Sequence, residues 1–138
     1  MSLFVDTSVW SLVFRRDAPA PANEPRELVR AIEAGEELVT TGLVLQELLQ
    51  GFSGPRNRAQ ILDRFAALPL LVPDRRDHVD AAELRNKCRR GGVQIQIGTI
   101  DALLAQLCLR HDLTMLTTDR DFRDIAGHCA LKLWTATA

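Results

Sequence analysis

Residues 3–8 read Leu-Phe-Val-Asp-Thr-Ser, an apolar run that ends at a carboxylate followed by two hydroxyl side chains. The run predicts a short buried strand, because no polar residue interrupts it. Asp, Thr and Ser commonly cap helix N-termini, so we expect a helix directly after this strand. A buried strand that leads straight into a helix is typical of a parallel α/β sheet.

The rest of the chain repeats this alternation of strand and helix. Further strands are expected at residues 38–41, 70–72, 114–117 and 130–134. Helical patterns occupy residues 24–34, 42–50, 56–67, 78–90, 99–111 and 119–126. Glycines close several of these helices, and two prolines keep residues 17–23 out of helix. The pattern predicts a single α/β domain over residues 1–138, with three layers and a parallel sheet covered on both faces.

Composition is that of an ordinary globular protein, with 46% hydrophobic and 25% charged residues among 138. No apolar run approaches the roughly 20 residues that a membrane-spanning helix needs. We find no signal peptide either, so the protein is expected in the cytoplasm, with no membrane partner. Cys88, Cys108 and Cys129 are odd in number and include no C-x-x-C pair, which argues against a disulfide framework and against a zinc site.

The net charge of −1 conceals a preference for arginine, since only Lys87 and Lys132 of the 17 basic residues are lysine. A guanidinium group binds phosphate through a planar, bidentate fork, so the preference suits an enzyme of nucleic acids. A GC-rich genome would produce the same preference. Overall charge therefore does not indicate a nucleic-acid binder, and function has to be inferred from local features.

Two carboxylates stand where strands are expected to end. Asp6 follows the first strand and Asp119 follows the strand at 114–117. Sites in parallel sheets form beyond the carboxyl ends of the strands, so these two side chains converge if their strands are neighbours. Each aspartate alone, however, is better explained as a helix N-cap.

Glu47 is harder to explain as a structural residue. At about 100° per residue, the helix at 42–50 has a stripe of apolar residues that we expect to be buried. The stripe comprises Leu45, Leu48, Leu49 and Phe52. Glu47 projects at the margin of this stripe, whereas a solvent-facing glutamate would lie with Gln46 and Gln50.

Asp101 shares a helix face with Ala105 and Cys108, among otherwise apolar positions. It also lies in the first helical turn, where the helix dipole favours a negative charge. Because burial of an unpaired carboxylate is costly, Asp101 and Glu47 indicate either a bound cation or shifted pKa values.

Four acids with few basic residues near them indicate a divalent cation. Carboxylate oxygens select Mg²⁺ or Mn²⁺, and Mg²⁺ keeps water molecules that can act as nucleophiles. Without the metal, the carboxylates would repel one another. His78, His111 and His128 do not match this set, and we expect them to be surface or capping residues.

Four segments in order resemble the PIN-domain ribonucleases, most closely the VapC toxins of bacterial and archaeal toxin–antitoxin pairs. These segments are Asp-Thr-Ser-Val-Trp (6–10), Leu-Gln-Glu-Leu-Leu-Gln-Gly (45–51), Gly-Thr-Ile-Asp-Ala-Leu-Leu-Ala (98–105) and Leu-Thr-Thr-Asp-Arg-Asp-Phe (116–122). The resemblance implies a parallel five-stranded sheet with helices on both sides. It also implies an endoribonuclease activity that depends on Mg²⁺ or Mn²⁺.

The resemblance also implies roles for individual residues. The acidic quartet of the family corresponds to Asp6, Glu47, Asp101 and Asp119. Asp121 matches a frequent extra acid, which either binds metal through water or only caps the following helix. Ser8 matches a hydroxyl that supports Asp6, and Thr118 stands where a polar residue lines the site. Asp6 and Asp101 are the expected direct ligands, and a metal-activated water would attack an RNA phosphodiester.

An acidic centre repels RNA, so basic residues must compensate at its rim. The candidates are Arg15, Arg16 and Arg120, which lie near Asp6 or Asp119 in the sequence. A second basic cluster consists of Arg85, Lys87, Arg89 and Arg90. Its position at a helix C-terminus is explained at least as well by the helix dipole.

Protein partners are implied by the resemblance alone. They are a second copy of the chain, forming a homodimer, and a cognate antitoxin. An antitoxin segment would lie along an apolar groove and place a basic side chain in the acidic pocket. Phe52, Phe65 and Leu68 could line such a groove, although a core role is expected for each of them.

Other classes of protein remain open. A phosphatase of the haloacid dehalogenase type also ends its first strand with Asp and uses Mg²⁺. It needs a second Asp two residues later, where this chain has Ser8, and a suitably placed Lys. A phosphoacceptor receiver domain needs an acidic pair near the first strand and a late Lys, and we find neither. A catalytically silent RNA-binding domain would keep the same fold without turnover.

Overall fold

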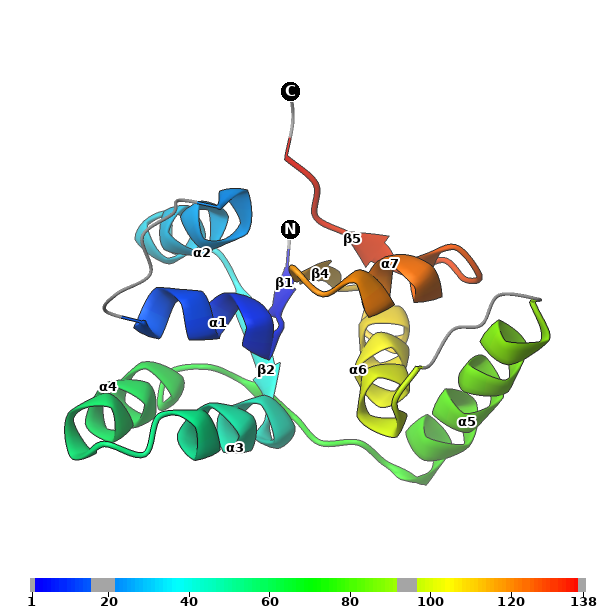
Figure 1. The fold of residues 1–138 in the computed structure, drawn as a ribbon, viewed down its shortest axis with the longest axis horizontal. Helices are drawn as coiled ribbons and strands as arrows, with labels where there is room; N and C mark the ends of the chain where they lie inside the picture. Colours follow the sequence, from blue (N-terminus) through cyan, green and yellow to red (C-terminus); the bar gives the residue numbers. More distant parts are fainter. Residues whose placement is uncertain (1, 16–21, 92–96, 137–138) are drawn as a thin grey trace.

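A computed structural model describes the chain except for residues 1, 16–21, 92–96 and 137–138 (Figure 1). Its strands form one five-stranded parallel sheet in the order β3-β2-β1-β4-β5. They are β1 (Leu3–Val5), β2 (Leu38–Thr41), β3 (Leu70–Leu71), β4 (Thr114–Leu116) and β5 (Lys132–Leu133). The predicted parallel sheet is confirmed, and β1 and β4 are neighbours, as the convergence of Asp6 and Asp119 requires.

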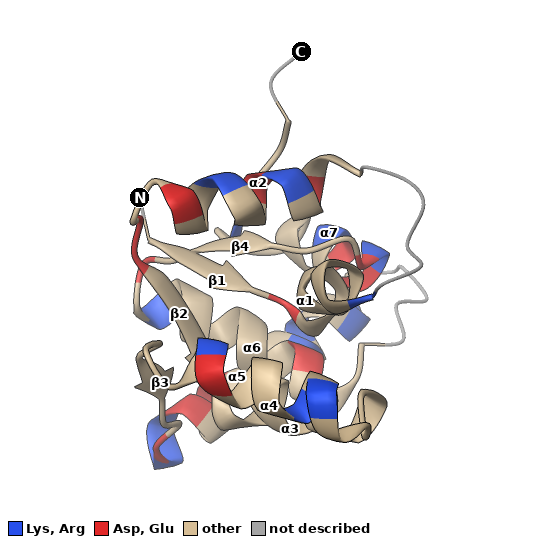
Figure 2. Ribbon diagram, turned by 90° about the vertical axis from the view of Figure 1, so that its left-hand side faces the viewer, with Lys and Arg blue, Asp and Glu red and all other residues tan. Residues whose placement is uncertain are grey.

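Helices cover both faces of the sheet. They are α1 (Thr7–Phe14), α2 (Asn23–Glu33), α3 (Gly42–Gly51), α4 (Pro55–Phe65), α5 (Arg75–Arg90), α6 (Thr99–Arg110) and α7 (Arg120–Ala126). Figure 2 shows α2 on one side of the sheet and α5 and α6 on the other, which makes three layers. In the part of the chain that the structure describes, no helix is long and apolar enough to cross a membrane.

The core is centred on β1, whose three residues are completely buried. Trp10 of α1 packs against Phe65 of α4, with ring centroids 4.9 Å apart. Phe65 is only 5% exposed, so it belongs to the core and cannot line a surface groove. Phe52 and Leu68, the other two candidates for that groove, are partly buried against the same core.

The largest difference from the predicted boundaries is the start of α5, which lies at Arg75 rather than at residue 78. The Asp74 carboxylate accepts a hydrogen bond from the Asp77 N–H, and the Asp77 carboxylate accepts one from the Asp74 N–H, each at 2.9 Å. This reciprocal capping box usually has Glu or Gln at its last position. Here Asp77 takes that place and also accepts a hydrogen bond from Arg110 of α6, which anchors α5 to α6.

The other helices begin and end close to their predicted limits. Gly35 follows α2 with a φ of +69°, a left-handed conformation that glycine adopts at little cost and that stops the helix. The edge strands β3 and β5 are shorter than the predicted ranges 70–72 and 130–134. Each edge strand pairs on one side only, which limits the length that the sheet can stabilise. The predicted loop at 17–23 lies mostly outside the described residues, and Asn23 already belongs to α2.

Candidate functional site

The carboxyl ends of β1 and β4 bring Asp6 and Asp119 to one edge of the sheet. The two strands pair in parallel, with Val5 opposite Leu116. The Asp6 N–H extends this pairing by donating to the Leu116 carbonyl at 2.9 Å. Asp6 is the N-cap residue of α1, and Asp119 is the N-cap residue of α7. The predicted convergence of these two acids is therefore confirmed.

Asp6 occupies a capping position, but its side chain does not cap the helix. The residue is 7% exposed, and its carboxylate accepts no hydrogen bond from a backbone N–H in the first turn of α1. Instead its Oδ2 accepts hydrogen bonds from Ser8 Oγ and from Thr117 Oγ1, both at 2.8 Å. Ser8 thus supports Asp6 as predicted. A capping role is consistent with the position of Asp6 directly before a helix. It does not explain why the carboxylate is bound by two hydroxyl groups.

Thr117 is the site residue that the sequence analysis missed. Besides donating to Asp6, its hydroxyl accepts a hydrogen bond from the Asp119 N–H at 3.0 Å, so one side chain connects two acids of the site. Thr118, the predicted lining residue, donates its backbone N–H to Ser8 Oγ at 3.1 Å. The strand register contains the missing signal, because residue 117 comes directly after the Val5–Leu116 pair and therefore lies beside Asp6.

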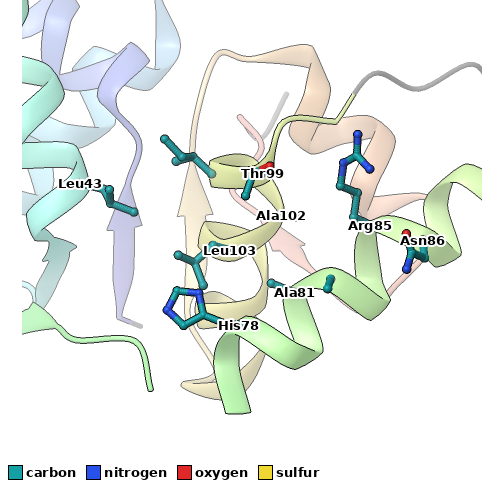
Figure 3. Close-up of a pocket in the computed structure, with 10 residues that line it drawn as sticks. Leu43, His78, Ala81, Arg85, Asn86, Thr99, Ala102 and Leu103 are labelled. Atoms are coloured by element: carbon teal, nitrogen blue, oxygen red, sulfur yellow. The ribbon is translucent and has the colours of Figure 1, made fainter. Parts of the chain in front are cut away.

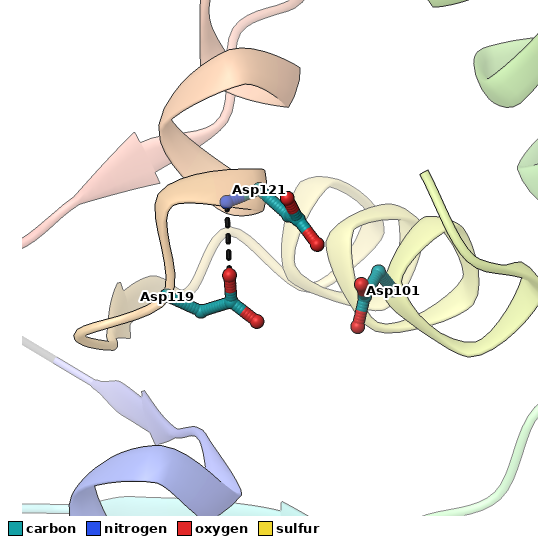
Figure 4. Close-up of side chains that lie close together, drawn as sticks. All are labelled: Asp101, Asp119 and Asp121. Atoms are coloured by element: carbon teal, nitrogen blue, oxygen red, sulfur yellow. Dashed lines mark hydrogen bonds between the residues drawn. The ribbon is translucent and has the colours of Figure 1, made fainter. Parts of the chain in front are cut away.

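Three aspartates form the tightest group of acids, which we call the inner trio. Carboxylate oxygens of Asp101, Asp119 and Asp121 all lie within 4.8 Å of one another. Figure 4 shows the three side chains pointing into the same space from α6 and from the start of α7. Asp119 Oδ1 also accepts a hydrogen bond from the Asp121 N–H at 2.9 Å, so Asp119, and not Asp121, caps α7. Asp6 lies outside this trio, although it was expected to be one of the two direct ligands.

The acidic surroundings are most evident at Asp101. Ala105 and Cys108, which share its helix face, are buried as predicted. Burial and, to a smaller extent, the charges of Asp119, Asp6, Asp121 and Glu47 together raise the pKa of Asp101 to about 6. The pKa of Asp121 is also raised, by burial and by the charges of Asp119 and Asp124. The charges of the four other predicted acids therefore all reach Asp101.

Glu47 is more exposed than its predicted position at the margin of a buried stripe implied. On α3 only Val44 and Leu48 are buried, and Glu47 is exposed. The helix packs against α1, α4 and β2. The predicted stripe does lie on the core, with Leu45, Leu49 and Phe52 partly buried against it. Nearby groups still displace water from the Glu47 carboxyl, which raises its pKa, and the Asp6 charge adds to this shift. Glu47 thus lies at the open border of the acidic cluster.

No basic side chain neutralises the cluster within the described residues. Asp6, Glu47 and the inner trio form no ion pair there with lysine, arginine or histidine. Of the predicted rim arginines, Arg15 and Arg120 are exposed, and Arg16 lies outside the described residues. The negative charge of the site therefore lacks a compensating protein cation in the part of the chain that we can describe.

The donor set of this site fits a hard divalent cation. The candidate ligand atoms of the inner trio are all carboxylate oxygens, which Mg²⁺ and Mn²⁺ prefer over softer metals. No histidine or cysteine of the described chain belongs to the group. A divalent cation would offset both the burial and the repulsion that raise the pKa values of Asp101 and Asp121.

Comparison with known proteins agrees with this description. A family model for the PIN domain matches residues 3–128. Ribonuclease VapC11 of Mycobacterium tuberculosis is 29% identical to this chain over 125 residues, which cover 90% of this chain and 91% of that protein. DNA-bound VapBC from Salmonella typhimurium has the same fold, with a TM-score of 0.72 and 17% identity over 97% of both chains. VapBC-5 from Mycobacterium tuberculosis, a member of the VapBC family of toxin–antitoxin systems, matches with a TM-score of 0.65 and 22% identity over 98% of both chains.

The metal-free protein should lose stability as the pH rises from 4 to 8 in EDTA. The pKa of Asp101 rises from 3.8 to about 6 on folding, so the folded state holds this proton more tightly. Its contribution is complete below 3.8 and disappears as the pH passes 6. Asp101→Asn should remove this dependence and raise the free energy of unfolding at pH 8 by about 1–2 kcal/mol, allowing for solvent screening.

Urea unfolding in EDTA at several pH values measures this effect. Asp63→Asn on α4, an exposed acid far from the site in the sequence, is the matched control and should follow the wild-type curve. Identical curves for Asp101→Asn and Asp63→Asn would show that the carboxylates of the cluster do not repel one another.

Proposed function

The chain belongs to the PIN domain family, and on that basis we propose that it is a VapC-type endoribonuclease that hydrolyses RNA phosphodiester bonds with Mg²⁺ or Mn²⁺. The observation that carries this proposal is the gathering of Asp6, Glu47 and the inner trio at one sheet edge, with no basic partner among the described residues. The ribonuclease name of the matched VapC11 supports RNA as the substrate class.

We assign the cation to the inner trio, with Asp6 beside it. When bound, the metal supplies Lewis-acid stabilisation of the phosphate and lowers the pKa of a water molecule. Ser8 and Thr117 hold the Asp6 carboxylate in one orientation through their two hydrogen bonds to Oδ2. Among the described residues no side chain donates to Asp6 Oδ1, so this oxygen is free for a ligand.

Glu47 is the residue that we assign to proton transfer. Its raised pKa makes it a stronger base than an ordinary carboxylate, and it lies at the open border of the cluster. It would accept a proton from the water whose oxygen attacks phosphorus, while the bond from phosphorus to the leaving ribose oxygen breaks. Arg15 and Arg120, both exposed, are the proposed contacts to the phosphates on either side of the cut.

The rival phosphatase has less support. Its second aspartate would have to replace Ser8, whose hydroxyl instead donates to Asp6. A catalytically silent RNA-binding domain would not require so many uncompensated carboxylates, since an acidic surface weakens RNA binding. We therefore favour the metal-dependent ribonuclease over both alternatives.

We also infer that the protein pairs with an antitoxin. The matched VapBC-5 structure from Mycobacterium tuberculosis belongs to the VapBC family of toxin–antitoxin systems, which supports this partner. Three residues were predicted to line an antitoxin groove. Phe52 and Leu68 stay candidates because each is only partly buried and keeps some surface for a partner. Phe65 is a core residue and is no longer a candidate. The homodimer and the cytoplasmic location stay predictions.

Incubation of total RNA with purified protein tests the proposed activity. Wild type should cleave RNA in Mg²⁺ or Mn²⁺ and should not cleave it in EDTA. Asp101→Asn should lower cleavage by more than the roughly 10–100-fold that loss of an outer-shell partner of a metal site costs, whereas Asp63→Asn should leave it unchanged. Cleavage that persists in EDTA or in Asp101→Asn would contradict the proposal. Rapid hydrolysis of p-nitrophenyl phosphate would favour the phosphatase instead.

A second prediction concerns the hydroxyl that sequence reasoning missed. Thr117→Val keeps the side-chain shape but removes the hydrogen bonds to Asp6 and from Asp119, so Mn²⁺ affinity should fall about 10–100-fold. Thr118→Val is the matched control, because Thr118 contributes a backbone N–H that the substitution retains. Isothermal titration with Mn²⁺ measures both affinities. Equal affinities for the two variants would rule out the proposed role of Thr117.

A further inference from the structure

A pocket of about 310 Å³ lies between α3, α5 and α6 (Figure 3). Its walls are mainly apolar, with Leu43 from α3 and Leu103 from α6 among the residues that line it. Ile100 at the pocket is 43% exposed, so part of the apolar wall faces solvent. We call this space the α5–α6 pocket.

The α5–α6 pocket shares two helices with the acidic cluster. On α6, Thr99, Ile100 and Ala102 line the pocket, while Asp101 among them belongs to the inner trio. On α3, Leu43 lines the pocket, and Glu47 follows one helical turn later. A nucleotide whose phosphate lies at the cluster could therefore reach the pocket with its base.

Polar groups of α5 complete the pocket. Arg85 donates its Nε–H to the Ile97 carbonyl at 2.8 Å, which holds the guanidinium plane in place. His78 and Asn86 are exposed, and neither side chain has a hydrogen-bond partner among the described residues. Figure 3 shows Arg85 and Asn86 on α5, with His78 nearer to Leu103. Planar guanidinium and imidazole groups stack on RNA bases, and an amide can hydrogen-bond to a base edge.

Positive charge continues beyond the pocket. Asn86 also lines a shallower hollow with Arg89 and Arg90. No ion pair joins either arginine to another residue of the described chain. The acids, the apolar pocket and the free arginines thus follow one another along α6 and α5. This order matches a nucleotide chain, because arginine side chains bind the phosphates on either side of a base.

We propose that the α5–α6 pocket binds one base of the RNA, on the nucleotide next to the phosphate that is cut, and that Arg85 and Asn86 select this base. That the ligand is RNA rests on the proposed function. The pocket volume is at the lower end of the range for small-molecule sites and is enough for a single base. One base edge read by paired hydrogen bonds corresponds to about 5- to 150-fold discrimination.

The first test measures binding without cleavage. A pool of RNA with randomised positions is equilibrated with the protein in EDTA at low ionic strength, and the retained RNA is sequenced. Wild type should enrich one base at one position by about tenfold. Ala82→Trp, which fills the pocket from an exposed position, and Asn86→Ala should abolish this enrichment. Glu83→Ala, an exposed α5 residue that is not part of the pocket lining, is the matched control and should keep it.

The second test sequences the ends that each protein produces from the same pool in Mg²⁺. The preferred base should flank the cut in wild type and Glu83→Ala, and the preference should disappear in Ala82→Trp and Asn86→Ala. Base enrichment without any cleavage would overturn the proposed function but support the pocket. A preference that all variants keep, or no preference in wild type, would overturn the pocket. Ala82→Trp could instead change the oligomeric state and lower the cleavage of every RNA equally. That result would assign the pocket to a contact between copies and overturn the inference.

Discussion

The parallel pairing of β1 with β4 is the constraint on which the acidic site depends. It places Asp6 beside Thr117 and brings the start of α7 to the same sheet edge as the start of α1. Asp6 lies between β1 and α1. Asp119 lies between β4 and α7, and Asp121 lies in the first turn of α7. Asp101 and Glu47 then reach the site from α6 and α3. Any change in the order of these two strands would disperse the carboxylates.

Carboxylates gathered in this way destabilise a protein unless something compensates them. Burial, together with this repulsion, raises the pKa values of Asp101, Asp121 and Glu47. Part of it is offset by hydrogen bonds, since two hydroxyls donate to Asp6 and the α7 backbone donates to Asp119. Hydrogen bonds do not neutralise charge, however, and no described basic side chain does so. The arrangement is stable and useful at neutral pH if a divalent cation completes it, and the same charge then serves catalysis.

Much of this architecture could be predicted from the sequence. The alternation of short apolar runs with helical patterns predicted the parallel sheet, and the ends of β1 and β4 predicted where Asp6 and Asp119 meet. Asp101 could be predicted because Ala105 and Cys108 place its helix face against the core. What escaped prediction depends on contacts between elements. Glu47 is exposed although the apolar stripe beside it packs on the core. Thr117 acquires its role from strand register, and α5 starts early because Asp74 and Asp77 cap each other.

The most direct measurement of the central claim is a crystal structure of the protein soaked in Mn²⁺, with data collected at a wavelength that reveals the anomalous signal of manganese. The account predicts an anomalous peak within bonding distance of carboxylate oxygens from at least two of Asp101, Asp119 and Asp121, with Asp6 beside it. A peak only at other surface acids, or an arginine or lysine side chain occupying the centre of the cluster in place of the ion, would contradict it.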